Sequence, residues 1–125
     1  MHTNDELISA QLRTDPEFRA EWERTALARA VAEAIIRYRA EHNLSQRQLG
    51  ERLGMKQPQV ARLELGEVNP SMETLTRVSA QLGIEFTIDV RPTGTPAYNV
   101  TRRAQANNLV GSFRGDDVQI LVAAR

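Results

Sequence analysis

The sequence contains no cysteine, only two histidines and no long apolar run. Without cysteine, the chain can form neither disulfides nor thiolate metal sites. His2 and His42 are too few and too far apart for a histidine-rich metal site, so we expect no metal and no cofactor. No stretch approaches the length of a membrane helix, and no charged-then-apolar signal opens the sequence. These absences predict an intracellular, cytoplasmic protein without a membrane segment.

Catalytic motifs are missing from the sequence as well. We find no nucleophile–histidine–acid cluster and no glycine loop of the kind that cradles phosphates. Lys56 is the only lysine, and it lies inside the central stretch described below, so it is unavailable for a serine–lysine pair. We therefore expect that the protein is not an enzyme.

The net charge is zero, with 16 basic and 16 acidic residues, and this balance by itself argues against a nucleic-acid partner. The charges are nevertheless unevenly distributed. Residues 1–24 carry six acidic side chains against three basic ones, whereas residues 37–62 carry six basic against two acidic. Either segment can be an ordinary solvated helix surface, but the second can also form a basic face.

The central stretch, residues 44–66, reads LSQRQLGERLGMKQPQVARLELG. Ser45 and Gln48 have the spacing of a capping box at the start of a helix. Leu49 and Leu53 give that helix one apolar face. The first half of the stretch therefore predicts a short helix with its apolar side toward a core.

A second short helix follows after a tight turn. Gly54 can adopt a positive φ and end the first helix. Pro58 fits the first turn of the second helix, where a proline loses no helical hydrogen bond, and Gly66 ends that helix. Two short helices joined by a turn with a glycine form the helix-turn-helix pattern.

Two helices are expected before this stretch. The first spans residues 4–12, and the second starts at Asp15-Pro16-Glu17 and runs to about His42. One face of the long helix is apolar, and its members are Phe18, Trp22, Ala26, Ala30, Val31, Ala34, Ile35 and Tyr38. Its first half needs another surface, which can be a second protomer, a partner protein or the short helix folding back.

After the stretch, Ser71 can cap a helix that runs through Leu82. Residues 84–90 then alternate like a strand with one buried side. The expected buried side consists of Ile84, Phe86, Ile88 and Val90. Residues 91–96 read as a linker or turn.

The tail is less regular. Residues 100–110 are compatible with a helix, Gly115-Asp116-Asp117 with a turn, and residues 118–122 with a strand. Because a lone strand is unstable, the strand at 84–90 needs a partner. That partner can be the tail strand, the same strand of a second chain, or both.

These patterns predict a mainly α fold. At 125 residues the chain fits a single domain with one modest core. We expect a helix-turn-helix bundle with a long N-terminal helix and a small C-terminal β element. Its segments are an acidic helical arm (1–24), the helix-turn-helix domain (25–83) and a strand, linker and tail that can dimerise (84–125).

The central stretch resembles the lambda-repressor-like, Xre-type helix-turn-helix family. The resemblance rests on Ser45-Gln46, on QPQVARLELG at residues 57–66, and on Asn69-Pro70-Ser71, and it covers residues 31–82. The aspartate-proline start of the long helix and the strand after the bundle make the chain similar to HigA-type antitoxins of toxin–antitoxin modules. Stand-alone regulators share this arrangement, and the tail beyond Pro92 lies outside the common core of the family.

The resemblance implies that the second helix enters the DNA major groove. Gln57 can then pair with adenine and Arg62 with guanine, and Gln59 is the next candidate. Lys56 stands where the family often has serine or threonine. It loses the capping oxygen, at a typical cost of about 1 kcal/mol, but as a lysine it can reach a phosphate or a guanine edge unless it is simply solvated.

The resemblance also implies supporting contacts around the reading helix. Gln46 is expected to bind a phosphate and to brace the base-reading glutamine. Arg47 and Asn69 are further candidates for phosphate contacts. Glu64 is expected to make a structural bond, because DNA would repel it.

The predicted function is a sequence-specific repressor of transcription that binds double-stranded operator DNA as a homodimer. The narrower prediction is the antitoxin of a type II toxin–antitoxin module that represses its own operon. The alternatives are a stand-alone Xre-type regulator and an interaction module that mainly neutralises a toxin. The acidic arm would suit a basic toxin by charge complementarity.

Overall fold

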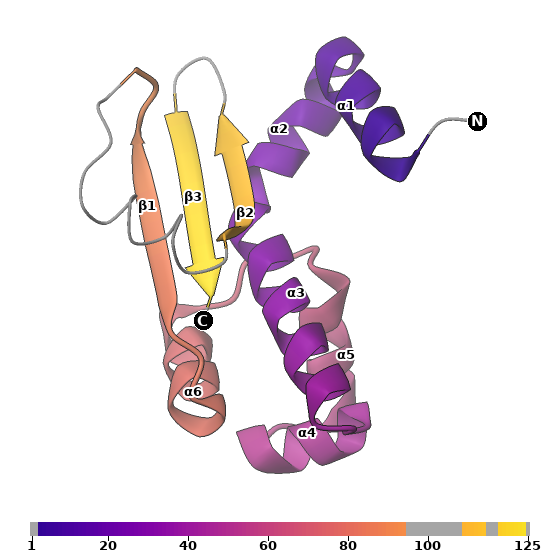
Figure 1. The fold of residues 1–125 in the computed structure, drawn as a ribbon, viewed down its shortest axis with the longest axis vertical. Coiled ribbons are helices and arrows are strands. Elements are labelled where there is room, and N and C mark those ends of the chain that lie inside the picture. The colour runs from indigo at the N-terminus through magenta and orange to yellow at the C-terminus, as the bar shows by residue number, and fades with distance from the viewer. Residues whose placement is uncertain (1–2, 95–108, 115–117, 125) are drawn as a thin grey trace.

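The computed structural model describes residues 3–94, 109–114 and 118–124. Within these ranges, helices α3 to α6 form a bundle, a three-stranded antiparallel sheet lies beside it, and α1 and α2 project from the start of α3 (Figure 1). The elements are α1 (Asn4–Thr14), α2 (Pro16–Arg24), α3 (Ala26–Glu41), α4 (Gln46–Leu53), α5 (Gln57–Leu65), α6 (Met72–Leu82), β1 (Phe86–Pro92), β2 (Leu109–Arg114) and β3 (Val118–Ala124). The mainly α fold with a small C-terminal β element is therefore confirmed.

The helix-turn-helix consists of α4 and α5. At the start of α4, Ser45 and Gln48 form both hydrogen bonds of the predicted capping box. Gly54 ends α4 with φ 68°, and Gly66 ends α5 with φ 66°. Because these left-handed positions suit glycine, the two helices end where the sequence predicts.

The core draws on all four helices of the bundle. Its most deeply buried large side chains are Val31, Ile35, Leu49, Leu53, Val60 and Val78. Leu82, Ile84 and Ala124 extend the same cluster to the beginning of the sheet. The cluster therefore fixes α5 against α3 and α4, and joins the bundle to the sheet.

The long helix expected from residue 16 to about 42 is wrong in one respect, because it divides at Thr25 into α2 and α3. An unbroken helix would carry a hydrogen bond from the Ala28 N–H to the Arg24 carbonyl. The Asn69 side chain is inserted there instead: its Oδ1 accepts from the Ala28 N–H at 3.0 Å, and its Nδ2 donates to the Arg24 carbonyl at 2.6 Å. A side chain inserted in this way bends a helix.

The first half of the predicted long helix packs within the chain. Helix α1 folds back against α2, as one of the three alternatives proposed. The Phe18 and Trp22 rings lie 5.7 Å apart, and the Arg29 guanidinium lies 3.6 Å from the centre of the Trp22 ring. Partial burial lowers the pKa of Arg29 from its ordinary value, but an arginine remains charged at neutral pH.

The sheet has the strand order β1-β3-β2, and both pairs are antiparallel. Ile88 of β1 lies opposite Val122 of β3, so the tail strand is the partner that the first strand needs. The helix expected at residues 100–110 is wrong at its end, because Leu109 and Val110 belong to β2. The rest of that helix and the turn at 115–117 lie outside the described residues.

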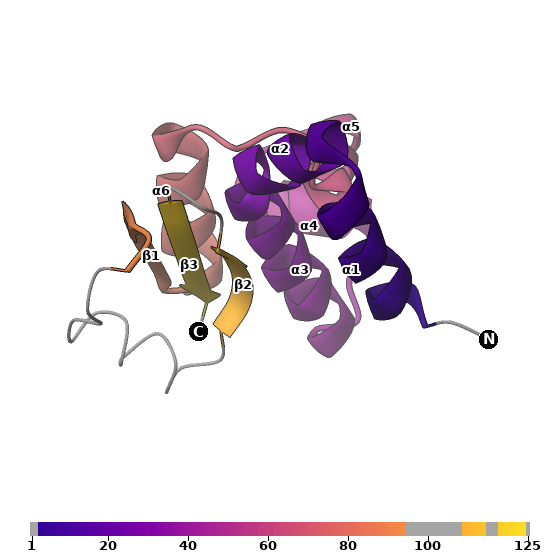
Figure 2. The same cartoon turned by 90° about the horizontal axis from the view of Figure 1, so that it is seen from above.

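The buried side of β1 is only partly as predicted. The strand begins at Phe86, two residues later than predicted, and includes residues 91 and 92 of the expected linker. Ile84, just before it, is buried and Phe86 is partly buried, but Ile88 and Val90 are 39% and 63% exposed. Figure 2 shows α6 beside the sheet, and Phe86 and Ile88 are the β1 residues that line the shallow groove between α6 and β1. The apolar side of the strand is therefore covered at its beginning and exposed beyond.

The opposite side of β1 carries a buried ion pair that the alternating pattern did not predict. The side chains of Asp89 and Arg91 are 9% and 7% exposed. The Arg91 Nε donates to Asp89 Oδ1 at 2.8 Å, and a second guanidinium nitrogen bonds to Oδ2. Because each charge compensates the other, the polar side of the strand can be buried.

Candidate nucleic-acid interface

Helix α5 turns one side toward the core and the other toward solvent. Val60 is fully buried and Leu63 packs against the core cluster. Gln57, Gln59 and Arg62 are exposed. The side chains predicted to read DNA therefore lie on the outer side of the helix, and its core contacts hold them in place.

The start of α5 is joined to the start of α4 by a pair of glutamines. The Gln57 Nε2 donates a hydrogen bond to the Gln46 Oε1 at 2.7 Å. The side-chain contact expected between the bracing and the base-reading glutamine is therefore present. It places two amides from different helices next to each other at the end of α5 that would enter a groove.

Behind this pair lies a second layer of polar contacts. Arg39 of α3 donates to both carboxylate oxygens of Glu64, with distances of 2.7, 3.1 and 3.2 Å. The Gln46 Nε2 lies 3.4 Å from the Glu64 Oε2. The Glu64 side chain is only 7% exposed, so its predicted structural bond is confirmed.

Lys56 precedes α5 with an exposed side chain that makes no capping hydrogen bond. An ammonium has no acceptor, so it cannot replace the oxygen of a serine or threonine. The Gln59 Oε1 instead accepts from the Lys56 backbone N–H at 2.9 Å. Gln59 therefore caps the start of its own helix, in addition to its predicted place among the residues that face DNA.

The remaining candidates lie around this centre. Arg47 is 84% exposed and is 3.9 Å from Glu51 one turn along α4. Arg62 lies farther along α5 and lines a shallow groove between α5 and the start of α6. Asn69 lines the same groove, but both ends of its side-chain amide are used at the bend between α2 and α3.

The helix-turn-helix family profile matches residues 35–88. Antitoxin HigA1 of Mycobacterium tuberculosis is 32% identical over 119 residues, which are 94% of this chain and 76% of that relative. The chain belongs to the lambda-repressor-like helix-turn-helix family. An uncharacterised HTH-type transcriptional regulator of Haemophilus influenzae is 41% identical over 59 residues, which are 47% of this chain and 60% of that relative. No solved structure matches the chain.

A helix-turn-helix of this family identifies the chain as a DNA-binding regulator of transcription. The structure brings Gln46, Lys56, Gln57 and Gln59 together around the start of α5. Arg39 was not singled out in the sequence, although it holds Glu64 in place. Sequence spacing does not reveal this ion pair, because Glu64 is 25 residues away along the chain. In the sequence, Arg39 appears only as one of the six basic residues of segment 37–62.

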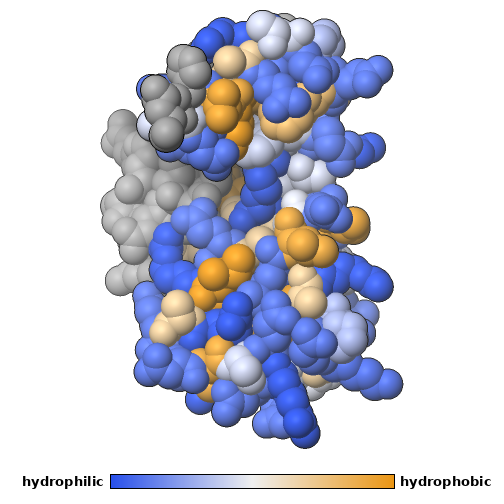
Figure 3. Space-filling view, turned by 90° about the vertical axis from the view of Figure 1, so that its right-hand side faces the viewer, coloured by the Kyte–Doolittle hydropathy of each residue, from blue (hydrophilic) through white to orange (hydrophobic). Residues whose placement is uncertain are grey.

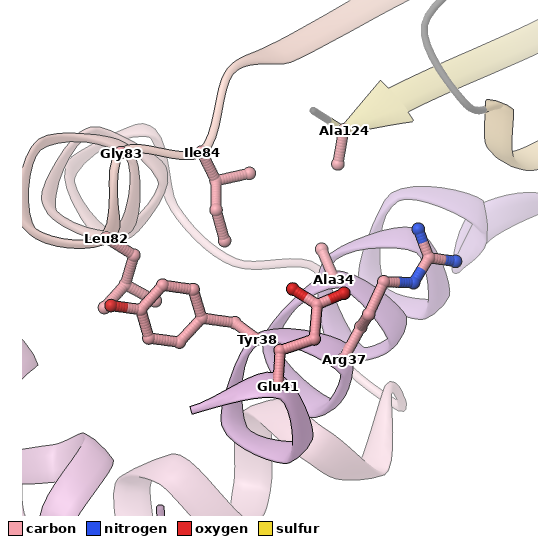
Figure 4. Close-up of a pocket in the computed structure, with 8 residues that line it drawn as sticks. All are labelled: Ala34, Arg37, Tyr38, Glu41, Leu82, Gly83, Ile84 and Ala124. Atoms are coloured by element: carbon pink, nitrogen blue, oxygen red, sulfur yellow. The ribbon is translucent and has the colours of Figure 1, made fainter. Parts of the chain in front are cut away.

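Other candidate sites lie away from this interface. A shallow pocket of about 200 Å³ lies where α3, the end of α6 and the end of β3 meet (Figure 4). Tyr38, Leu82 and Ile84 form its apolar wall, and Arg37 and Glu41 lie at its rim. None of its residues belongs to the set predicted to bind DNA.

In the part of the chain that the structure describes, no three His, Asp or Glu side chains lie close enough to hold a metal ion. None of the helices in that part combines the length and the apolar character needed to cross a bilayer.

Figure 3 shows the molecule from the right-hand side of Figure 1. The surface seen there is mostly hydrophilic, with separate hydrophobic patches.

Proposed function

We propose that the chain is a sequence-specific repressor that binds operator DNA as a homodimer, and that it is the antitoxin of a toxin–antitoxin module. The observation that carries the DNA-reading part is the Gln46–Gln57 hydrogen bond at the exposed start of α5. A glutamine held by a neighbour can present its remaining donor and acceptor to a base edge. Adenine offers the matching pair in the major groove.

The proposed contacts divide into base reading and phosphate binding. Gln57 reads adenine and Arg62 reads guanine, while Gln46, Arg47 and Lys56 bind phosphates. Gln59 remains a candidate for base contact through its amide nitrogen. We leave the Asn69 side chain out of the set, because both of its ends bond to backbone groups of α2 and α3.

The experiment is a competition binding assay with DNA from the region upstream of the chain's own gene. Gln57→Ala and Arg62→Ala are each expected to cost about 1–3 kcal/mol of discrimination between that DNA and unrelated DNA. The matched controls are Gln11→Ala and Arg13→Ala, exposed residues of α1, which should change nothing. Equal affinity of the wild type for both DNAs would contradict the proposal.

A homodimer is favoured by an exposed apolar patch formed by Met72 of α6 with Ile88 and Val90 of β1. These side chains are 73%, 39% and 63% exposed, and a shallow groove between α6 and β1 lies beside them. An uncharged apolar patch is suited to a second copy of the same patch across a two-fold axis. None of the three patch residues belongs to α5.

The antitoxin role is supported by the relative named Antitoxin HigA1, whose similarity covers 94% of this chain. The proposed acidic arm (1–24) lies before the helix-turn-helix domain (25–83) and the C-terminal segment (84–125). Neither α1 nor α2 has a buried residue. The arm therefore offers its acidic side chains to a basic partner, such as a ribonuclease toxin, without contributing to the core.

A further inference from the structure

Four side chains form a chain of hydrogen bonds that leads from the core to the DNA-reading end of α5. Arg39 bonds to Glu64, Glu64 to Gln46, and Gln46 to Gln57. The corresponding distances are 2.7, 3.4 and 2.7 Å. Arg39 also donates to the Leu44 carbonyl at 3.3 Å, so a backbone group holds the Arg39 end of this hydrogen-bond series.

The chemistry of these four side chains fixes which group donates and which accepts in each hydrogen bond. An ionised carboxylate can only accept, so Glu64 requires that Gln46 turn its amide nitrogen inward. The Gln46 oxygen then faces Gln57 and can only accept, so Gln57 must turn its own nitrogen toward Gln46. The Gln57 oxygen and its second N–H are left to face outward.

We propose that Glu64 is a positioning residue that sets the base preference of Gln57 by fixing the orientation of the Gln46 amide. The inference rests on the proposed function, in which Gln57 reads a base edge. Adenine presents a donor and an acceptor in the major groove, whereas guanine presents two acceptors. An outward oxygen with an outward N–H matches adenine, whereas the reversed amide would present two donors and match guanine.

Glu64 is suited to this role because its carboxylate is held from two sides. The Arg39 guanidinium donates to both of its oxygens. The side chain is 7% exposed, so water competes weakly for the oxygen that faces Gln46. The Glu64 carboxylate therefore orients Gln46 through one oxygen, while its ion pair with Arg39 links α5 to α3.

The test is Glu64→Gln in the full-length chain. The introduced amide can still accept from Arg39 with its oxygen and then turns an NH2 group toward Gln46, which reverses the Gln46 and Gln57 amides. Binding is measured to operators that carry each of the four bases at every position. We expect the preference for adenine over guanine at the Gln57 position to fall by about tenfold or more, the discrimination that one bidentate contact provides.

The control is Arg39→Gln, which weakens the ion pair but leaves the Glu64 carboxylate as the acceptor for Gln46. It should lower the thermal stability while keeping the adenine preference. A merely structural ion pair predicts that both variants lose affinity for all bases alike. A folded Glu64→Gln variant that retains the adenine preference overturns the inference.

A second measurement does not depend on the folding of a variant or on DNA. In the wild-type protein, a scalar coupling across the hydrogen bond should connect the Gln57 Nε2 with the Gln46 side-chain carbonyl carbon. A coupling in the opposite sense, from the Gln46 Nε2 to the Gln57 carbonyl carbon, would contradict the inference.

Failure of the proposed function gives a different result from failure of the Glu64 role. If Gln57→Ala leaves base preference unchanged, the proposed function itself fails.

Discussion

Asn69 replaces one hydrogen bond of a helix with two hydrogen bonds through its own amide. It lies in the loop between α5 and α6, yet its partners are backbone groups of Arg24 and Ala28, 45 and 41 residues away. Both groups lie at a bend where they would otherwise lack the partner that a straight helix supplies. One side chain thus ties the arm to the DNA-binding domain.

We predict that Asn69→Ala destabilises the protein by about 1–3 kcal/mol, because two backbone groups lose their partners. Asn69→Asp should also destabilise the protein, because it keeps the acceptor for the Ala28 N–H but places a second acceptor oxygen against the Arg24 carbonyl. Chemical denaturation measures both effects. If Asn69 instead contacts a phosphate, Asn69→Ala would weaken binding to all DNA sequences alike; we expect the folded variant to keep its DNA affinity.

The roles of Asn69 and Gln46 show what residue types can predict. The Gln46–Gln57 contact was expected because a family pattern fixes both positions relative to one turn. The position of Asn69 depends on where the long helix meets a loop that follows it by more than 40 residues. No local spacing encodes such a contact.

At the scale of elements, α4 and α5 pack closely because Gly50 lacks a side chain. A Cβ atom built on Gly50 would lie 2.5 Å from the Met55 carbonyl oxygen and 3.4 Å from a methyl group of Val60. The nearer atom belongs to the backbone of the turn, so it cannot move without shifting the turn. Gly50 therefore sets how α5 is presented.

Gly50→Ala is expected to destabilise the protein by about 1–3 kcal/mol through overpacking, although alanine has the better helix propensity. Gly54→Ala is the control in the same turn, because the space around Gly54 is open and only its φ of 68° opposes a side chain. Thermal unfolding measures the stability of both variants. In the DNA-binding assay only Gly50→Ala should lose affinity, because it displaces α5. Equal losses of affinity would show that the close approach does not position α5.

The helices whose ends were predicted correctly have start and stop residues within their own sequence. Helices α4, α5 and α6 begin and end at caps and glycines that are local in sequence. The buried side of β1 and the division at Thr25 depend on tertiary partners. Alternation predicts that a strand has two different sides, but the position of α6 decides where the apolar side is covered.

At the scale of the whole molecule, the proposed functions occupy different surfaces. DNA reading belongs to the outer side of α5, dimerisation to the apolar patch on α6 and β1, and toxin binding to the arm of α1 and α2. Substitutions can therefore separate the three functions.

Val90→Lys is expected to convert the dimer to a monomer, because it places a charge in the apolar patch of both copies. Leu7→Lys is the matched control, since Leu7 of α1 is 56% exposed and Val90 is 63% exposed. Sedimentation at micromolar concentration gives the mass of each variant. A monomeric wild type with and without DNA, or a Val90→Lys variant that stays dimeric, would count against the proposed interface.

The arm is tested by the double variant Asp5→Lys and Glu17→Lys, which reverses two exposed charges outside the helix caps. Affinity for the protein encoded by the adjacent gene should fall by about tenfold or more, since a close charge pair at an interface contributes ~1.5 kcal/mol or more. Glu67→Lys with Glu73→Lys is the control outside the arm. Unchanged affinity in the arm variant would reject the arm as the toxin site.

The central claim is that two copies of the chain read DNA through α5. The most direct test is a footprint of the wild-type protein on the DNA upstream of its own gene. We predict two symmetric half-sites about 10 base pairs apart, centre to centre, as expected for a two-fold dimer, with an adenine in each half-site whose protection requires Gln57. A single asymmetric site, or no footprint from the folded protein, would contradict the account.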